Sequence, residues 1–186
     1  MGVVRVGMSM SLDGFVADRN GSAAPLYPDL AELRYGEAVA EEIATTGAVL
    51  MGRRSYEMGD TEQGFVDYEF QVPIFVLTHR VPEVPAKHDP AKGLTFTFVT
   101  DGIESAVEQA RAAAGEKDVT VIGGASTVQQ LLAAGLADEL QISFMPLLLG
   151  EGLRMFENLG SAPRRLERIK VIEAPVRTDV RYRILS

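Results

Sequence analysis

The sequence predicts an α/β protein with a mostly parallel sheet that ends in an antiparallel hairpin. Short runs rich in β-branched residues alternate with segments of helical spacing over most of the 186 residues, which is the pattern of parallel strands joined by helices. The last two extended segments, 164–173 and 177–185, flank Ala174-Pro175, and the second alternates apolar and polar residues. Such a pair favours an antiparallel closing hairpin.

The amino-terminal half begins with a buried strand over residues 3–11, which is apolar with small interruptions. A turn at 12–14 and a short extended piece at 15–17 follow. Apolar residues at helical spacing predict a helix over 29–46, and Gly47 ends it. A short strand at 48–51 then leads through a glycine into a short helix that reaches Met58.

The carboxyl-terminal half repeats the alternation. Strands are expected at 72–78, 94–99, 119–122 and 139–145. A helix is expected after Asp101, and another after Ser126. Residues 147–156 are expected to form a loop. No repeat, low-complexity segment or linker interrupts the chain, so residues 1–186 are expected to form a single domain.

The most informative stretch is 119–136, where a strand runs through Gly123 and Gly124 into a helix. Ser126 and Gln129 have the spacing of a capping box. A helix N-terminus after a glycine turn offers free backbone N–H groups and the positive end of the helix dipole, which suits an anion such as phosphate. Two glycines do not complete the dinucleotide fingerprint, so a tight turn without a ligand stays the alternative.

Composition excludes several classes of function. The chain has no cysteine and two histidines, which removes disulfides, thiol nucleophiles and the usual zinc sites, and we expect no metal. A net charge of −8 argues against nucleic acid and anionic membranes as partners. We find neither a membrane-spanning run nor a secretory leader, so a cytoplasmic location is expected.

Ligands of open parallel sheets gather at the carboxyl ends of the strands. Four predicted strand ends carry suitable residues: Met8, Ser9, Asp13 and Gly14; Gly52, Arg53, Arg54 and Ser55; Thr78, His79 and Arg80; Gly123, Gly124, Ala125, Ser126 and Thr127. The guanidinium fork of arginine donates two hydrogen bonds to a phosphate at once. Three arginines beside two glycine turns therefore predict a ligand with several phosphates, against the alternative of a solvated surface.

The segments GMSMSLDGFVA, VLMGRRSYE, VPIFVLTHR and VIGGASTVQQLL occur in the order and spacing of the dihydrofolate reductase fold. The closer likeness is to the reductase (C-terminal) domain of the riboflavin-biosynthesis deaminase–reductase and its stand-alone relatives. That domain is resembled in SLDG, in the glycine turn and in LLAAGLADELQISFMPLLLGEG. The resemblance covers nearly the whole chain and implies a mixed eight-stranded sheet, NADPH as the hydride donor and a homodimer.

The same resemblance implies roles for the residues at the four strand ends. Met8 and Ser9 would lie against the nicotinamide, and 13–16 would form part of a covering loop. Residues 52–55 would serve the pyrophosphate and the ribose phosphate, 78–80 would surround the adenosine phosphate, and 123–127 would hold the pyrophosphate. The deaminase half is missing, so no deamination is expected. The paired acids of the riboflavin-pathway reductase are replaced by RRSYEMGD, which leaves a pyrimidine or a pterin-like substrate open.

Reduction of a C=N or C=O group also needs a proton donor beside the acceptor. Asp29 is the first candidate, because Pro28-Asp29-Leu30-Ala31 resembles the start of the helix that bears the substrate-binding acid in dihydrofolate reductase. Tyr27 and Glu32 are weaker candidates, and a simple helix cap is the alternative for Asp29.

These observations predict an NADPH-dependent reductase of a small heterocyclic substrate, with a riboflavin-pathway reductase as the first possibility. A dihydrofolate reductase-like activity and a non-catalytic nucleotide- or small-molecule-binding protein on the same fold are the alternatives. A phosphate-binding hydrolase is disfavoured, because the sequence has no lysine-bearing P-loop.

Overall fold

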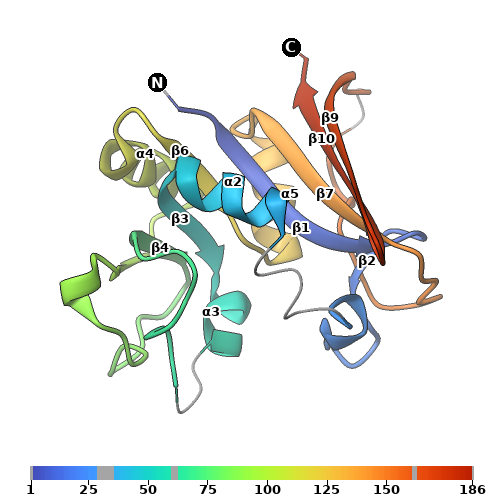
Figure 1. Cartoon of the computed structure of the whole chain (residues 1–186). Helices are drawn as coiled ribbons and strands as arrows, with labels where there is room; N and C mark the ends of the chain where they lie inside the picture. The colour runs from blue at the N-terminus through green and yellow to red at the C-terminus, as the bar shows by residue number, and fades with distance from the viewer. Residues whose placement is uncertain (1, 29–35, 60–62, 161–162, 186) are drawn as a thin grey trace.

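The computed structural model describes residues 2–28, 36–59, 63–160 and 163–185 of the chain. In these ranges one sheet contains eight strands in the order β5-β4-β3-β6-β1-β7-β10-β9 (Figure 1). The strands are β1 (Val4–Ser11), β3 (Thr46–Gly52), β4 (Pro73–Leu77), β5 (Thr95–Val99), β6 (Asp118–Val121), β7 (Glu139–Met145), β9 (Leu166–Ala174) and β10 (Arg177–Ile184). Two short strands, β2 (Phe15–Ala17) and β8 (Leu153–Arg154), pair beside this sheet.

The strand directions confirm the predicted fold class. The strands from β5 to β7 in the sheet order run parallel, whereas β10 is antiparallel to β7 and β9 is antiparallel to β10. Each predicted strand agrees with an observed one to within two residues at either end. The prediction of a plain loop over 147–156 was wrong in one respect. It missed β8, which has two residues and therefore too little pattern to detect.

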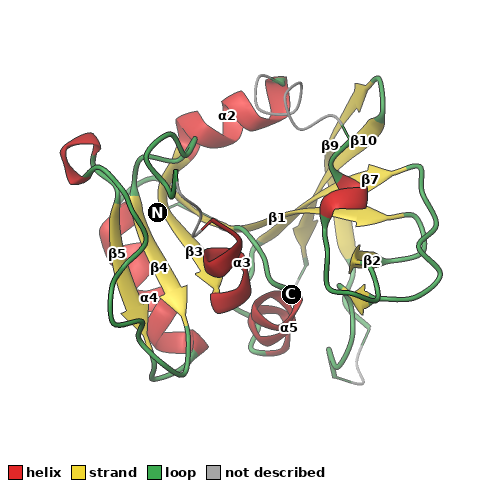
Figure 2. Cartoon of the chain, turned by 90° about the horizontal axis from the view of Figure 1, so that it is seen from below, coloured by secondary structure: helices red, strands yellow, loops and turns green. Residues whose placement is uncertain are grey.

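Helices cover both faces of the sheet (Figure 2). They are α2 (Glu37–Thr45), α3 (Arg53–Gly59), α4 (Ile103–Ala114) and α5 (Ala125–Ala133), with 3-10 turns η1 (Ala24–Leu26) and η2 (Pro90–Lys92). The first part of the helix predicted over 29–46 lies outside the described residues, and α2 confirms the second part. The prediction of one continuous helix was wrong at Gly36, which has an extended backbone and is the N-cap residue of α2. None of the helices in the described ranges is long and apolar enough to cross a membrane.

The larger core lies between the sheet and helices α4 and α5. Alternate residues of the central strands, such as Val4 and Val6 of β1, face this side and are fully buried. Val107 of α4 and Leu131 of α5 meet them at helical spacing. This apolar contact fixes the start of α5 against the end of β6, where the glycine turn lies.

The opposite face carries a second, smaller core over β3, β4 and β5. Met51 and Ile74 lie beneath an aromatic group in which the Tyr56 and Phe65 rings stack with centroids 5.8 Å apart. The Tyr56 hydroxyl accepts a hydrogen bond of 2.6 Å from the Ala86 backbone N–H, so its polar end is satisfied in the core. This core anchors α3 at the end of β3.

The same face turns polar over the remaining strands. Strand pairing places one row of residues on this side, which we call the polar sheet face: Arg5, Gly7, Ser9 and Ser11 of β1, Glu139, Gln141 and Ser143 of β7, and Asp179 and Arg181 of β10. All of these except Gly7 and Ser143, which are partly exposed, are buried. Burying polar groups costs free energy unless they are paired, so the contacts of these residues decide whether this face is stable.

Candidate functional site

The four strand ends that the sequence singles out lie along one edge of the sheet. Strands β4, β3, β6 and β1 are consecutive neighbours and run parallel, so their carboxyl ends meet at the same rim. The rim therefore contains residues 78–80, 52–55, 123–127 and 8–14 side by side. The structure brings the predicted cofactor-binding residues together, and their binding role stays a prediction.

The backbone ladder opens between β1 and β6 at this rim. The two strands pair only over Val4–Val6 and Val119–Val121 in the described structure. Beyond that point β1 continues along β7, whereas the chain after β6 follows β3, where Ile122 N–H donates to Leu50 O at 2.9 Å. The break lies between Gly7, Met8 and Ser9 on one side and the glycine turn on the other.

The glycine turn opens directly into α5. Gly123 has a φ of 62°, which favours glycine, and the Gly123–Gly124 peptide bond is cis. Gly124 is the N-cap residue and provides no side-chain cap, so the predicted capping box is wrong. Because the helix begins before Ser126, that hydroxyl instead accepts from Gln130 Nε2 at 3.2 Å, and Gln129 Nε2 donates to Arg154 O at 3.1 Å.

The turn after β6 and the turn after β3 are held together at a distance that only glycine permits. Gly52 N–H donates to Gly123 O at 3.0 Å. A Cβ atom on Gly52 would lie 2.5 Å from Thr127 Oγ1, and one on Gly123 would lie 2.5 Å from Ser55 Oγ. Two hydroxyl groups and the first N–H groups of α5 thus converge on one small area. This arrangement suits a diphosphate.

The arginines lie at the border of that area. Arg53 and Arg54 are exposed on the first turn of α3, and Arg53 Nε lies 3.3 Å from Glu57 Oε1 in a surface pair. Such a pair is worth little, so the Arg53 guanidinium can turn to a phosphate at small cost. On the next strand end, the buried Thr78 hydroxyl donates to Arg80 O at 2.9 Å and accepts from Arg80 N–H at 3.2 Å. That turn leaves Arg80 exposed.

Asp13 fastens the turn after β1 to the segment before β8. Its carboxylate accepts from Ser11 Oγ at 2.6 Å and from the backbone N–H groups of Leu149 and Gly150 at 3.1 and 2.7 Å. These hydrogen bonds, the one from Ser11 first, lower the pKa of Asp13 to about 2. The Asp13 side chain therefore ties the turn after β1 to residues 149–150. Its predicted contribution to cofactor binding would act through the position of this turn.

The nominated proton donor, Asp29, lies outside the described residues, as does Glu32. The described part of α2 contains a different acid, which the sequence reading passed over. Glu42 is buried with 8% of its surface exposed, and its Oε1 has no hydrogen-bond partner among the described residues. From the sequence alone, Glu42 looks solvent-exposed, because it follows another acid, Glu41, on an amphipathic helix. The signal that could have identified it is the row of small and polar residues on β1, because α2 covers that row.

Glu42 lies directly over β1. Its Oε1 would be 2.7 Å from a Cβ atom on Gly7, so the missing side chain of Gly7 leaves room for the carboxyl group. Burial raises the pKa of Glu42 from 4.5 to about 7, although the charges of Arg5 and Arg181 oppose this. Glu42 therefore holds its proton to near-neutral pH at the edge of the break between β1 and β6.

Comparison with known proteins agrees with the fold. A family model described as the RibD C-terminal domain matches residues 3–177. The protein YyaP of Bacillus subtilis (strain 168) is 26% identical over 153 residues, which cover 80% of this chain and 77% of YyaP.

Two solved structures share the fold over nearly the whole chain. A putative riboflavin biosynthesis protein from Shewanella sp. PV-4 has a TM-score of 0.76 and 24% identity, with 99% of each chain covered. A diaminohydroxyphosphoribosylaminopyrimidine deaminase/5-amino-6-(5-phosphoribosylamino)uracil reductase from Thermotoga maritima has a TM-score of 0.68 and 19% identity. The match covers 99% of this chain and 57% of that one.

Proposed function

The chain belongs to the RibD C-terminal domain family, and we propose that it is an NADPH-dependent oxidoreductase of a small heterocyclic substrate. The observation that carries the proposal is the break between β1 and β6 beside the joined glycine turns. A flat ring can enter a sheet only where two strands part, and a diphosphate needs donors at a fixed distance from that ring. The rim supplies both.

The residues of the rim divide the binding of NADPH between them. The α5 N-terminus, with Ser55 and Thr127, holds the diphosphate, while Arg53, Arg54 and Arg80 take the phosphate on the adenosine ribose. Met8 and Ser9 flank the nicotinamide, which supplies a hydride when it is bound. Because backbone groups and short hydroxyls make most of these contacts, the ring is oriented without large side-chain movements.

The substrate that we propose is a ribosylated aminopyrimidine. The Thermotoga maritima protein is named as a deaminase and a 5-amino-6-(5-phosphoribosylamino)uracil reductase, and the match covers 57% of it. The polar sheet face next to the break offers serine hydroxyls and ion pairs, which suit an acceptor rich in amino, carbonyl and hydroxyl groups. Asp29, which the sequence nominates as the proton donor, stays a prediction.

We also propose that the protein is a homodimer. Strand β9 is the outer strand of the sheet, and it exposes Leu166, Ile169 and Val171, while the turn to β10 exposes Val176. An open edge strand with exposed apolar residues favours pairing with a second chain. Light scattering should give the mass of two chains, and Val171→Lys should shift it toward one. A monomeric wild-type protein would refute this part.

One experiment tests the central proposal. NADPH is added to the protein and nicotinamide fluorescence is followed. The loss of reduced-nicotinamide absorbance is then followed with 5-amino-6-(5-phosphoribosylamino)uracil and, separately, with dihydrofolate. Turnover of the first compound supports the proposal, and turnover of dihydrofolate alone supports a pterin reductase. Binding of NADPH without turnover of either supports a binding protein, and no binding refutes the proposal.

A further inference from the structure

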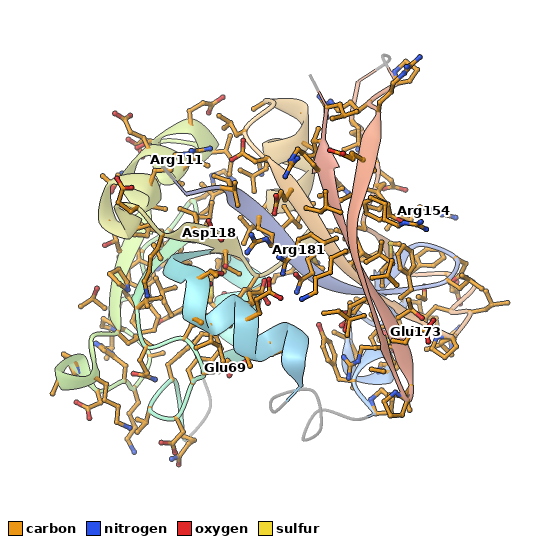
Figure 3. The ribbon with its side chains drawn as sticks, turned by 45° about the horizontal axis from the view of Figure 1, so that its top comes forward. Glu69, Arg111, Asp118, Arg154, Glu173 and Arg181 are labelled. Carbon is orange, nitrogen blue, oxygen red and sulfur yellow. The ribbon has the colours of Figure 1, made fainter. Side chains whose placement is uncertain are left out.

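The unpaired carboxyl group of Glu42 is unusual for its surroundings, because the charged groups around it are engaged with other partners. Arg5 of β1 lies 3.0 Å from Asp118 and 3.1 Å from Glu139. Arg181 of β10 donates to Gln141 at 2.8 Å and to Glu41 at 2.9 Å. Figure 3 shows Arg181 between α2 and the β9–β10 hairpin. The described structure thus leaves Oε1 of Glu42 buried and without a hydrogen-bond partner.

The surroundings of Glu42 favour its neutral form. Arg5 faces it from β1, Arg181 and Asp179 face it from β10, and Glu41 is its neighbour on α2. The two arginines favour the carboxylate, whereas the two acids and burial favour the carboxylic acid, and burial is the largest effect. Asp179 itself accepts a hydrogen bond from the Ser143 hydroxyl, which keeps it in place on the polar sheet face.

The position of Glu42 connects it with the rim. Gly7, over which the carboxyl group lies, is the first residue of β1 beyond the segment that pairs with β6. The next residue, Met8, brings its Cε within 3.8 Å of the Cβ position of Gly123 on the far side of the break. The carboxyl group thus lies on the α2 face of β1, over the residue that precedes Met8 at the border of the break.

We propose that Glu42 is the proton donor of the reaction, an inference that rests on the proposed reductase function. The acceptor is the C=N group that forms when the ribose ring of the substrate opens, as the bond from the anomeric carbon to the ring oxygen breaks and the N–H proton passes to that oxygen. Its carbon gains a hydride from the reduced nicotinamide, its nitrogen gains the proton of the Glu42 carboxyl, and the π bond breaks as the C–H and N–H bonds form. Glu42 is left as a carboxylate, which Arg5 and Arg181 stabilise until solvent returns the proton. This assignment replaces the sequence-based nomination of Asp29 as the proton donor.

The test compares Glu42→Gln with Glu41→Gln, its neighbour on the same helix. NADPH affinity is measured by fluorescence, and kcat is measured with NADPH and 5-amino-6-(5-phosphoribosylamino)uracil from about pH 5 to about pH 9. Glu42→Gln should keep NADPH affinity and lose about 10²-fold or more in kcat. In the wild type kcat should fall above pH 7, and in Glu42→Gln this pH dependence should be absent.

Glu41→Gln should keep the maximal kcat and move the fall to lower pH, because Glu41 favours the protonated form of Glu42. Glu42→Asp should recover part of the rate. Asp29→Asn should raise KM and keep the pH dependence. A Glu42→Gln variant with wild-type kcat and pH profile overturns the proton-donor role and leaves the reductase proposal standing.

A measurement on the unmodified protein does not depend on the variants. The infrared C=O stretching band of a protonated carboxyl group should be present at neutral pH, and the Glu42→Gln variant identifies it. Addition of the aminouracil substrate with oxidised NADP should shift this band. A band that does not move overturns the inference, because a purely structural carboxyl would be unaffected. A wild-type protein that neither binds NADPH nor turns over refutes both proposals.

Discussion

Replacing Glu42 by glutamine should change how the stability of the protein depends on pH. The pKa of the Glu42 carboxyl is raised from 4.5 to about 7 in the folded state, so folding favours the protonated form. The resulting stability is fully present below about pH 4.5 and is lost as the pH rises through about 7. Glutamine has the same shape and does not titrate, so it removes this dependence.

The expected magnitude follows from the two pKa values. Each pKa unit corresponds to about 1.4 kcal/mol, so the wild type should lose about 3 kcal/mol relative to Glu42→Gln between pH 4.5 and pH 8. The group is almost fully buried, so little of this is screened by solvent. Urea unfolding at a series of pH values measures it, and the gap between the two midpoints should change by about 1 M or more.

Comparing the two proteins at each pH cancels the titrating groups that do not interact with Glu42. Asp13 and Glu41 have lowered pKa values, so their contribution to stability is present above their ordinary pKa values and is lost as the pH falls. The contribution of Asp13 is the same in both proteins, so the difference between them reports Glu42 together with its interaction with Glu41 and Asp179. A free-energy difference that stays constant from about pH 4 to about pH 8 would show that Glu42 is not held protonated by the fold.

Three further predictions concern the rim. Arg53→Ala should weaken NADPH binding about tenfold and leave NADH binding almost unchanged, because the guanidinium is assigned to the ribose phosphate; fluorescence titration with each nucleotide checks this, and equal losses would remove the assignment. Gly52→Ala should abolish most NADPH binding, since its Cβ would lie 2.5 Å from Thr127 Oγ1, and Thr127→Ala in the same protein should restore part of it; a Gly52→Ala protein with wild-type affinity would show that the two turns can separate at no cost. Asp13→Asn should make residues 147–152 more sensitive to limited proteolysis, because it weakens the hydrogen bonds from Leu149 and Gly150. The wild type should keep its resistance down to about pH 4, because the pKa of Asp13 is about 2. Equal cleavage rates in the two proteins would show that Asp13 does not hold this segment.

The sheet was predictable because each strand has a recognisable local sequence pattern. Segments such as 119–122 and 139–145 are short, apolar and bounded by turn residues, and their order along the chain implies a parallel arrangement. The assembly of the rim follows from the same rule, since parallel strands end on one side. Local propensity was sufficient here because tertiary contacts reinforce it.

Features that depend on contacts between distant residues were not predictable in this way. The Ser126 hydroxyl has the spacing of a cap, but α5 begins before it, because contact with β3 places the turn at Gly124. Asp13 reads as a local turn residue, yet its partners Leu149 and Gly150 are far away in the chain. Glu42 reads as a surface residue because only the fold shows that it covers Gly7.

The short pairing of β1 with β6 has a mechanical consequence. Three residue pairs at the amino ends, Val4–Val6 with Val119–Val121, form the ladder between the two halves of the sheet in the described structure. The two halves are therefore joined at one end and separate at the other. Most of the predicted cofactor residues lie on the half with β3, β4 and β6, whereas Met8, Ser9 and the polar sheet face lie on the half with β1 and β7. Substitutions in the Val4–Val6 ladder, far from the rim, should change the distance between the two halves at the rim.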